Sequence, residues 1–196
     1  LPAFPEKAVR PNGLAACKEW EAGLQIVRWV RQKLDSFGRE KQLVLFLGDG
    51  AYDQVEFWKR LPERVVMAVR TAKNRALWAL PEPYSGRGRR RKYGEQTLHP
   101  QEWLHQSEGW SRCRLQVRGR VREVTYRIEG PFLRKGMPER PLFLIVQKGN
   151  TWVSGKKEPK RKRREPCYYL VSAVKQADDW VLPLPTVVIL AWLWQR

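Results

Sequence analysis

The run of residues 42–48, QLVLFLG, constrains the fold more than any other stretch of this chain. It has the length of a strand, and its apolar residues follow one another without polar alternation. Strands with this pattern are buried on both faces, usually in a sheet that helices cover. The run therefore predicts an α/β fold, with this strand inside the sheet.

A helix is expected just before this strand, from about Leu14 to Phe37. Its apolar residues recur at three- and four-residue spacing, which defines one buried face. Asn12 is expected to cap the start of the helix, and Gly38 stands where a helix commonly stops. The residues of the buried face are Trp20, Leu24, Val27, Val30 and Leu34.

Two aspartates, Asp49 and Asp53, follow the strand. Asp53 stands three residues before Glu56, and this D-x-x-E pattern predicts a capping box at the start of a helix. Asp49 comes at the carboxyl end of a buried strand, where α/β sheets place their binding crevices. Gly48 and Gly50 flank it and allow close approach. Asp49 is therefore either a ligand-binding carboxylate or an Asx-turn residue, and the pattern alone leaves both open.

The middle of the chain is predicted to be rich in strands. Residues 112–130 alternate apolar and basic side chains around Arg118-Gly119, which predicts a β-hairpin with a basic outer face. Further strands are expected at 64–70, 141–147 and 167–174, a charged loop at 154–166, and a last helix over about 181–194 that Asp178 and Asp179 lead into. The expected inner face of the hairpin is Leu115, Val117, Val121, Val124, Tyr126 and Ile128, and the outer face is Arg112, Arg114, Arg118, Arg120 and Arg122.

Positive charge is the strongest compositional signal. The chain has 38 Lys and Arg against 20 Asp and Glu, a net charge of +18, which indicates a polyanionic partner such as nucleic acid. Basic residues cluster in three places, although any one cluster could equally be a solvated loop. The candidate DNA-binding residues are Arg87, Arg89, Arg90, Arg91 and Lys92; Arg118 and Arg120; and Lys160, Arg161, Lys162, Arg163 and Arg164.

Catalytic carboxylates are scarce. The chain has five aspartates. Four of them fit structural roles at the ends of helices, namely Asp35, Asp53, Asp178 and Asp179, whereas the structural explanation of Asp49 is weaker. Two histidines and three widely separated cysteines do not favour a metal site built from these residues. No P-loop, G-x-G-x-x-G or Ser-His-Asp order is present.

The apolar run 181–194 is shorter than the ~20 residues of a membrane span, so no membrane partner is expected.

Four stretches, taken in order, resemble the DDE transposases of bacterial insertion sequences. They are GDGAYDQVEFWKRLPERVVMAVRTAKNRALW (48–78), PEPYSGRGRRRKYG (81–94), ERPLFLIV (139–146) and LPLPTVVILAWLWQR (182–196). The resemblance implies a ribonuclease H-like α/β core interrupted by a β-rich insertion. It also implies Mg²⁺ or Mn²⁺ ions held by two aspartates and a glutamate, with Asp49 matching the second aspartate.

The family's first aspartate and its glutamate fall outside this chain, so the resemblance implies a fragment that does not cleave DNA alone. Residues 1–62 would belong to the core, 63–180 to the insertion and 181–196 to the last core helix. The implied parent is a transposase that cuts and joins double-stranded DNA at element ends and target. It would be a cytoplasmic, nucleoid-associated protein and a possible homodimer. The alternatives are a non-enzymatic nucleic-acid-binding module with a basic β-hairpin surface and, third, a small-ligand α/β domain.

Overall fold

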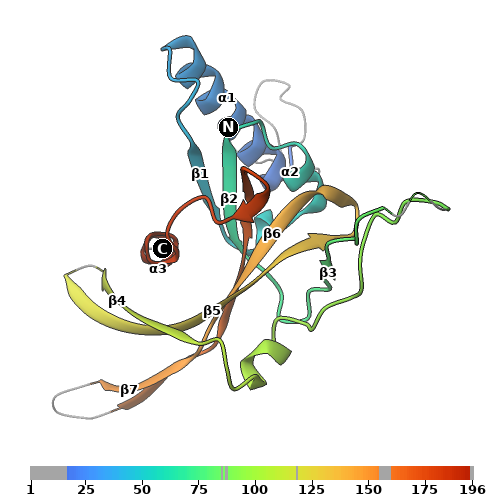
Figure 1. The fold of residues 1–196 in the computed structure, drawn as a ribbon. Coiled ribbons are helices and arrows are strands. Elements are labelled where there is room, and N and C mark those ends of the chain that lie inside the picture. Colours follow the sequence, from blue (N-terminus) through green and yellow to red (C-terminus); the bar gives the residue numbers. More distant parts are fainter. Residues whose placement is uncertain (1–16, 85, 87, 118, 155–159, 195–196) are drawn as a thin grey trace.

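A mixed β-sheet forms the centre of the molecule (Figure 1). The computed structural model describes residues 17–84, 86, 88–117, 119–154 and 160–194. Within them the sheet has seven strands in the order β1-β2-β9-β6-β5-β3, with β4 paired to β5. The strands are β1 (Val44–Gly48), β2 (Val65–Arg70), β3 (Trp78–Ala79), β4 (Ser111–Val117), β5 (Arg120–Arg134), β6 (Met137–Gln147) and β9 (Cys167–Ser172). The predicted α/β fold class is confirmed.

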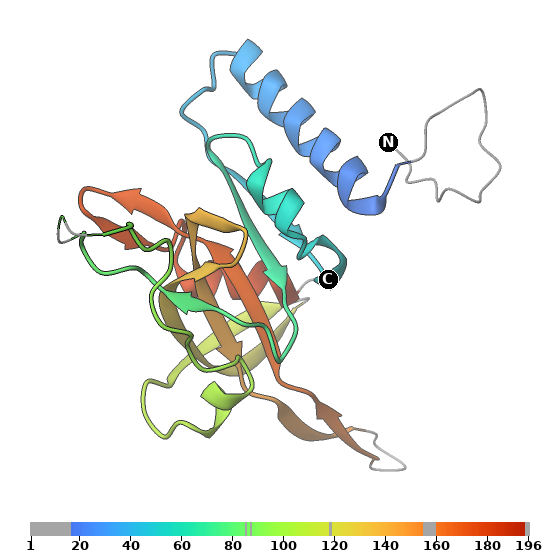
Figure 2. The same cartoon turned by 90° about the vertical axis from the view of Figure 1, so that its right-hand side faces the viewer.

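Helices α1 (Glu19–Ser36) and α2 (Val55–Lys59) cover one face of this sheet (Figure 2). Leu24 and Val27 of α1 pack with Phe57 and Trp58 of α2 over the side chains of β2, β6 and β9. The alternation of side chains along the strands explains why this layer takes Val65, Met67 and Val69, whereas Ala68 belongs to the opposite layer.

Helix α1 begins later than the sequence predicts, at Glu19. Lys18 is its N-cap, and the backbone N–H of Lys18 donates to the Glu21 carboxylate over 2.9 Å. The prediction that Asn12 caps this helix is therefore wrong; Asn12 itself lies outside the described residues. Gly38 follows the helix with φ +67°, a left-handed conformation that commonly ends helices, so the predicted stop is confirmed.

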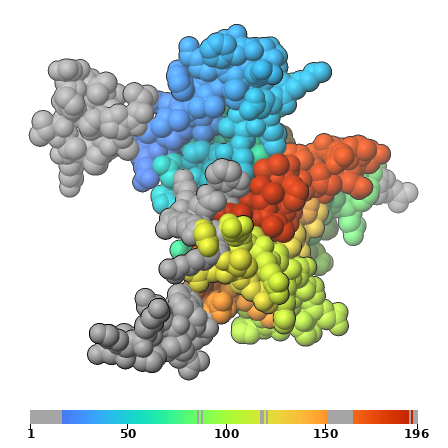
Figure 3. All heavy atoms as spheres, turned by 90° about the vertical axis from the view of Figure 1, so that its left-hand side faces the viewer, coloured from blue at the N-terminus to red at the C-terminus, as the bar shows by residue number. Residues whose placement is uncertain are grey.

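Helix α3 (Thr186–Trp194) covers the other face and packs against the β4–β5 hairpin (Figure 3). Ile189, Leu190 and Leu193 are buried there with Leu115 and Val124. No helix among the described residues is both long and apolar enough to cross a membrane.

The prediction that Asp178 and Asp179 start this last helix is wrong. Asp179 opens β11 (Asp179–Val181), which pairs with β10 (Val174–Gln176) in a small hairpin. Ala177 adopts φ +51° in the turn between the two strands. The tight hairpin takes up this part of the chain, so the helix does not begin until Thr186.

The predicted hairpin and its turn are confirmed, since β4 and β5 pair on either side of 118–119. The predicted faces of the hairpin are wrong in part. Val121 was expected on the inner face, but it is 67% exposed. The register pairs Val121 with Gln116 and Arg122 with Leu115, so Arg122 shares a face with the buried Leu115. In this register odd-numbered residues of β4 lie opposite even-numbered residues of β5, which the simple alternating pattern did not anticipate.

The predicted charged loop at 154–166 is also wrong over part of its length. Strands β7 (Asn150–Ser154) and β8 (Lys160–Arg164) pair there as an antiparallel ribbon that projects from the sheet (Figures 1 and 2). Short 3-10 helices follow β1 (Gly50–Tyr52) and precede β4 (Glu102–His105). The proposed division at residues 62/63 and 180/181 stays a prediction.

Candidate active-site turn and basic surfaces

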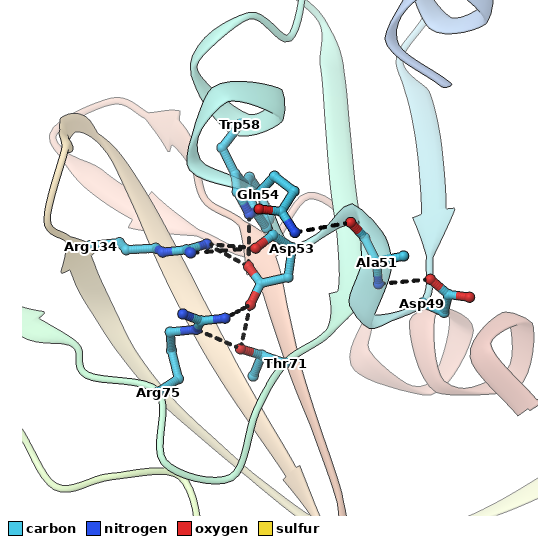
Figure 4. Close-up of polar contacts among 8 residues, drawn as sticks. All are labelled: Asp49, Ala51, Asp53, Gln54, Trp58, Thr71, Arg75 and Arg134. Atoms are coloured by element: carbon cyan, nitrogen blue, oxygen red, sulfur yellow. Dashed lines mark hydrogen bonds and ion pairs between the residues drawn. The ribbon is translucent and has the colours of Figure 1, made fainter. Parts of the chain in front are cut away.

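Asp49 lies at the carboxyl end of β1, in the turn that leads to α2. Its Oδ1 accepts a hydrogen bond from the backbone N–H of Ala51 over 2.9 Å, which is the geometry of an Asx turn. The residue is nevertheless exposed, and Figure 4 shows its carboxylate turned away from the cluster around Asp53. The two interpretations left open by the sequence are therefore compatible, because the turn contact leaves the carboxylate at the surface.

Close packing fixes the point at which β1 ends. A Cβ on Gly48 would stand 2.7 Å from Val69 Cγ1 and 2.9 Å from Tyr52 Cβ, so no larger residue fits without movement. The ring of Tyr52 also packs edge-on against Phe46 at 5.2 Å between centroids. These contacts tie the turn that carries Asp49 to the core.

Asp53 is buried, with only 3% of the residue exposed. Its carboxylate accepts hydrogen bonds from Trp58 Nε1 at 3.1 Å and from Thr71 Oγ1 at 2.7 Å. Guanidinium nitrogens of Arg75 and Arg134 also donate to it, at 2.7 and 2.6 Å (Figure 4). One carboxylate thus joins the β1–α2 turn to the end of β2, the following loop and β5.

The predicted capping role of Asp53 is wrong. Helix α2 begins at Val55, Gln54 occupies the N-cap position, and no side-chain capping hydrogen bond forms. The D-x-x-E spacing is present in the sequence, but the two guanidinium groups bind Asp53 more strongly than backbone N–H groups can, since both partners are charged.

Burial changes the pKa of one arginine in this cluster. Desolvation lowers the pKa of Arg134 from its ordinary value, while the nearby negative charge of Asp53 raises it. Arg134 also donates to the backbone carbonyl oxygen of Asp53 at 3.2 and 3.3 Å. Thr71, Arg75 and Arg134 could not be predicted as partners from the sequence, because Arg134 is 81 positions away and no local pattern connects it to Asp53.

Asp49 is the sequence-predicted oxygen ligand for a divalent metal ion at this site, and it is exposed. Exposed carboxylates such as Asp49 suit Mg²⁺, which prefers oxygen ligands. Among the described residues, however, no three His, Cys, Asp or Glu side chains come close enough together to hold a metal ion. Asp35 lies at the far end of α1 and pairs with Arg31 at 2.8 Å. These residues therefore do not complete a metal site.

The first basic cluster forms one wall of an open pocket of about 570 Å³. Arg89, Arg90 and Arg91 line it together with Tyr84 and Tyr93. The three arginines and Lys92 are exposed, so their guanidinium and ammonium groups are accessible to a large ligand. Arg87 lies outside the described residues.

Tyrosine hydroxyls hold the shape of this loop. Tyr84 donates to the Gly88 carbonyl oxygen over 2.7 Å, and Tyr93 accepts from the Gly136 backbone N–H over 3.0 Å. The second contact joins the loop to the turn between β5 and β6. The segment that contains the arginines is therefore anchored to the sheet.

The other two clusters are described only in part. Arg118 lies outside the described residues, and so do the side chains of Arg120, Lys160, Arg161, Lys162 and Arg163. The backbone places Arg120 at the start of β5 and positions 160–164 along β8. Arg112 and Arg114 are exposed on β4.

One comparison with known proteins gives a family. The sequence model of the DDE superfamily endonucleases matches residues 2–130, about two thirds of the chain, including β1 and the Asp49 turn. No curated protein and no solved structure matches the chain. The α/β fold agrees with this match, and the chain belongs to the DDE endonuclease superfamily. This superfamily acts on DNA and generally uses divalent metal ions, so the resemblance seen in the sequence is confirmed at that level.

Proposed function

We propose that the chain is part of the catalytic region of a DDE transposase from a bacterial insertion sequence, and that Asp49 is one of its metal-binding carboxylates. One observation carries the proposal: an exposed aspartate follows a core strand, between two glycines, inside the segment that matches the family. The same position is where α/β sheets place their binding crevices.

Asp49 alone cannot support the reaction. At least one companion carboxylate of the proposed triad, which consists of two aspartates and a glutamate, would have to come from outside the described residues, since no three acidic, His or Cys side chains gather among them. Divalent ions, Mg²⁺ or Mn²⁺, would supply an activated water and stabilise charge on the phosphate. The contribution of this chain is to present the Asp49 carboxylate on a turn that core packing fixes.

The proposed substrate is double-stranded DNA, at the element ends and at the target. Exposed Arg89, Arg90, Arg91 and Lys92 support this, because arginine side chains fork onto phosphate oxygens. The whole chain carries a net charge of +18, which favours binding to a polyanion. Cytoplasmic localisation at the nucleoid and dimerisation of the full-length protein are further parts of this proposal.

The test is cleavage of supercoiled plasmid DNA with Mg²⁺ or Mn²⁺, using the product of the complete reading frame. Asp49→Ala is expected to abolish nicking and leave DNA affinity and thermal stability close to wild type, because Asp49 is exposed and makes one local hydrogen bond. Asp178→Ala is the matched control, since Asp178 is also an exposed turn aspartate. It is expected to retain nicking.

Nicking by Asp49→Ala at the wild-type rate would remove Asp49 from the metal site. Tight DNA binding by the wild-type protein without any metal-dependent nicking would instead favour the non-enzymatic nucleic-acid-binding module.

A further inference from the structure

Strands β1 and β2 run parallel, and their carboxyl ends lie side by side. Their register ends at the pair Gly48↔Val69, so the next positions along the two strands are Asp49 and Arg70. Asp49 keeps an extended backbone, with φ −89° and ψ −168°. A Cβ on Gly50 would stand 3.8 Å from the Arg70 carbonyl oxygen, so the chain that leaves Asp49 still lies against the end of β2. Arg70 is therefore the neighbour of Asp49 on the adjacent strand.

The side chains of Asp49 and Arg70 leave the sheet on the same face. Side chains alternate between the two faces along a strand, and residues directly opposite each other on neighbouring strands share a face. Leu47, two positions before Asp49, packs in the layer that α3 covers. Ala68, two positions before Arg70, is buried in the same layer. The carboxylate and the guanidinium therefore both belong to the face that carries α3.

Pairing with β9 fixes the backbone around Arg70. Arg70 lies opposite Tyr169 in the antiparallel β2–β9 pair, and the backbone N–H of Thr71 donates to the Tyr168 carbonyl oxygen over 2.9 Å. The side chain of Thr71 points to the other face, where its hydroxyl donates to Asp53 over 2.7 Å. Arg70 thus occupies a fixed position in the sheet, and its side chain points away from the Asp53 cluster.

An electrostatic effect also locates the Arg70 guanidinium on the α3 face. Tyr169 is buried in the layer that α3 covers, and this burial raises the pKa of its hydroxyl. The positive charges of Arg164 and Arg70 act in the opposite direction on the same pKa. The Arg70 guanidinium is therefore near enough to Tyr169 to stabilise a negative charge on that face.

Arg70 is available to a ligand. The first five residues of β2 are buried, and Arg70, the last, is exposed. Within the described part of the chain, no Asp or Glu forms an ion pair with it, Asp49 included. Arg75 and Arg134 differ in this respect, because both bind the Asp53 carboxylate, at 2.7 and 2.6 Å. Their charge holds the fold together, whereas the charge of Arg70 is left for a partner.

An exposed carboxylate next to an exposed guanidinium suits one phosphate group. Carboxylate oxygens are ligands for Mg²⁺, and a guanidinium forks onto phosphate oxygens. The carboxyl ends of parallel strands are also the edge at which α/β sheets bind ligands. The simpler interpretation of Arg70 is a solvated strand end, and the experiments below distinguish the two.

We propose that Arg70 is a catalytic residue that binds a non-bridging oxygen of the phosphate to be cleaved. The inference rests on the proposed function, which brings that phosphate to Asp49. In the hydrolysis, water adds to phosphorus and the P–O3′ bond breaks. One proton of the water ends on O3′, and the other stays with the phosphate. Arg70 transfers no proton; its fixed positive charge stabilises the negative charge on the phosphate oxygens in the transition state.

The test measures plasmid nicking and DNA affinity for Arg70→Gln and Arg70→Lys in the product of the complete reading frame. Arg70→Gln is expected to nick about 100-fold more slowly at saturating DNA, as happens when one preorganised donor is removed. Its Kd for DNA is expected to stay within about threefold of wild type, because only one of many phosphate contacts is lost. Arg70→Lys keeps the charge without the fork and is expected to recover part of the rate.

Arg39→Gln is the matched control. Arg39 is also exposed, and it lies between α1 and the start of β1, at the opposite end of that strand from Asp49. The variant loses the same charge and is expected to keep the wild-type rate and affinity. Thermal unfolding checks that all variants fold.

A second measurement does not depend on cleavage. Phenylglyoxal modifies accessible guanidinium groups, and mass spectrometry locates the modified arginines. Bound duplex DNA is expected to slow the modification of Arg70 in the wild-type protein more than that of Arg39, because a bound phosphate would cover the Arg70 guanidinium.

Three results would overturn the inference. The first is wild-type nicking by Arg70→Gln, which would leave Arg70 as a solvated strand end. The second is a loss of affinity with an unchanged rate at saturating DNA, and the third is modification of Arg70 that DNA does not slow. In each case the wild-type protein still nicks DNA, so the proposed function stands. Absence of metal-dependent nicking by the wild-type protein is a different outcome, and it would overturn the proposed function together with this inference.

Discussion

Asp53 shows how far a residue's role can differ from its local pattern. The spacing to Glu56 predicts a helix cap, yet the side chain is buried and binds Thr71, Arg75 and Arg134. Its partners come from the segment directly after β2 and from β5, and only the folded sheet brings these together. Local sequence could identify Asp49 as a candidate ligand, because that depended on a strand and its end. It could not identify the Asp53 cluster.

Asp53→Asn is expected to destabilise the protein by about 3–5 kcal/mol, because it removes one partner of a buried ion pair and leaves a buried guanidinium uncompensated. Chemical unfolding followed by tryptophan fluorescence measures the change. The exposed Asp178→Asn is the control and is expected to stay within about 0.5 kcal/mol of wild type. A loss of only about 1 kcal/mol in Asp53→Asn would match a helix cap instead.

At the scale of elements, the sequence predicted the positions of strands better than the ends of elements or the faces that strands bury. Continuous apolar runs correctly located β1, β2, β6 and β9, because burial on both faces leaves an unambiguous signal. The predictions were wrong for the start of α1, for the faces of the β4–β5 hairpin and for the ribbon. Each depends on pairing or capping partners that hydrophobic periodicity does not contain.

The end of β1 offers a comparison between two glycines on either side of Asp49. Gly48→Ala is expected to cost about 1–3 kcal/mol, as overpacked cores do, because its Cβ would collide with Val69 and Tyr52. It is also expected to impair metal-dependent nicking by displacing Asp49.

Gly50→Ala is the control for this substitution, because its Cβ would meet only the Arg70 carbonyl oxygen at 3.8 Å. Unfolding midpoints and plasmid nicking measure both variants. Equal effects of the two substitutions would argue that Gly48 does not position the turn.

At the scale of the whole molecule, basic residues occur at separate places around one sheet. The arginine pocket lies beside β3, and the ribbon extends from β6 and β9. Composition predicted a polyanionic partner, but it could not say where the charge would lie. The position of the ribbon depends on long-range pairing, and the pocket depends on Tyr84 and Tyr93 holding a loop.

Arg89→Gln, Arg90→Gln, Arg91→Gln is expected to weaken DNA binding and to make its salt dependence shallower by up to about 2.7, since each phosphate contact contributes about 0.9. Because such contacts carry little sequence information, the loss is expected to be similar for different DNA sequences. Titrations at several salt concentrations measure the slope. An unchanged slope would show that these arginines do not contact phosphates.

The Asp53 cluster also has a consequence for synthesis of the protein. The turn that carries Asp49 is complete once Asp53 is made, but its anchor Arg134 follows 81 residues later. A nascent chain on the ribosome therefore has the carboxylate long before it has the guanidinium that secures the turn. A truncated translation product ending before β5 would therefore present Asp49 on a loosely held segment.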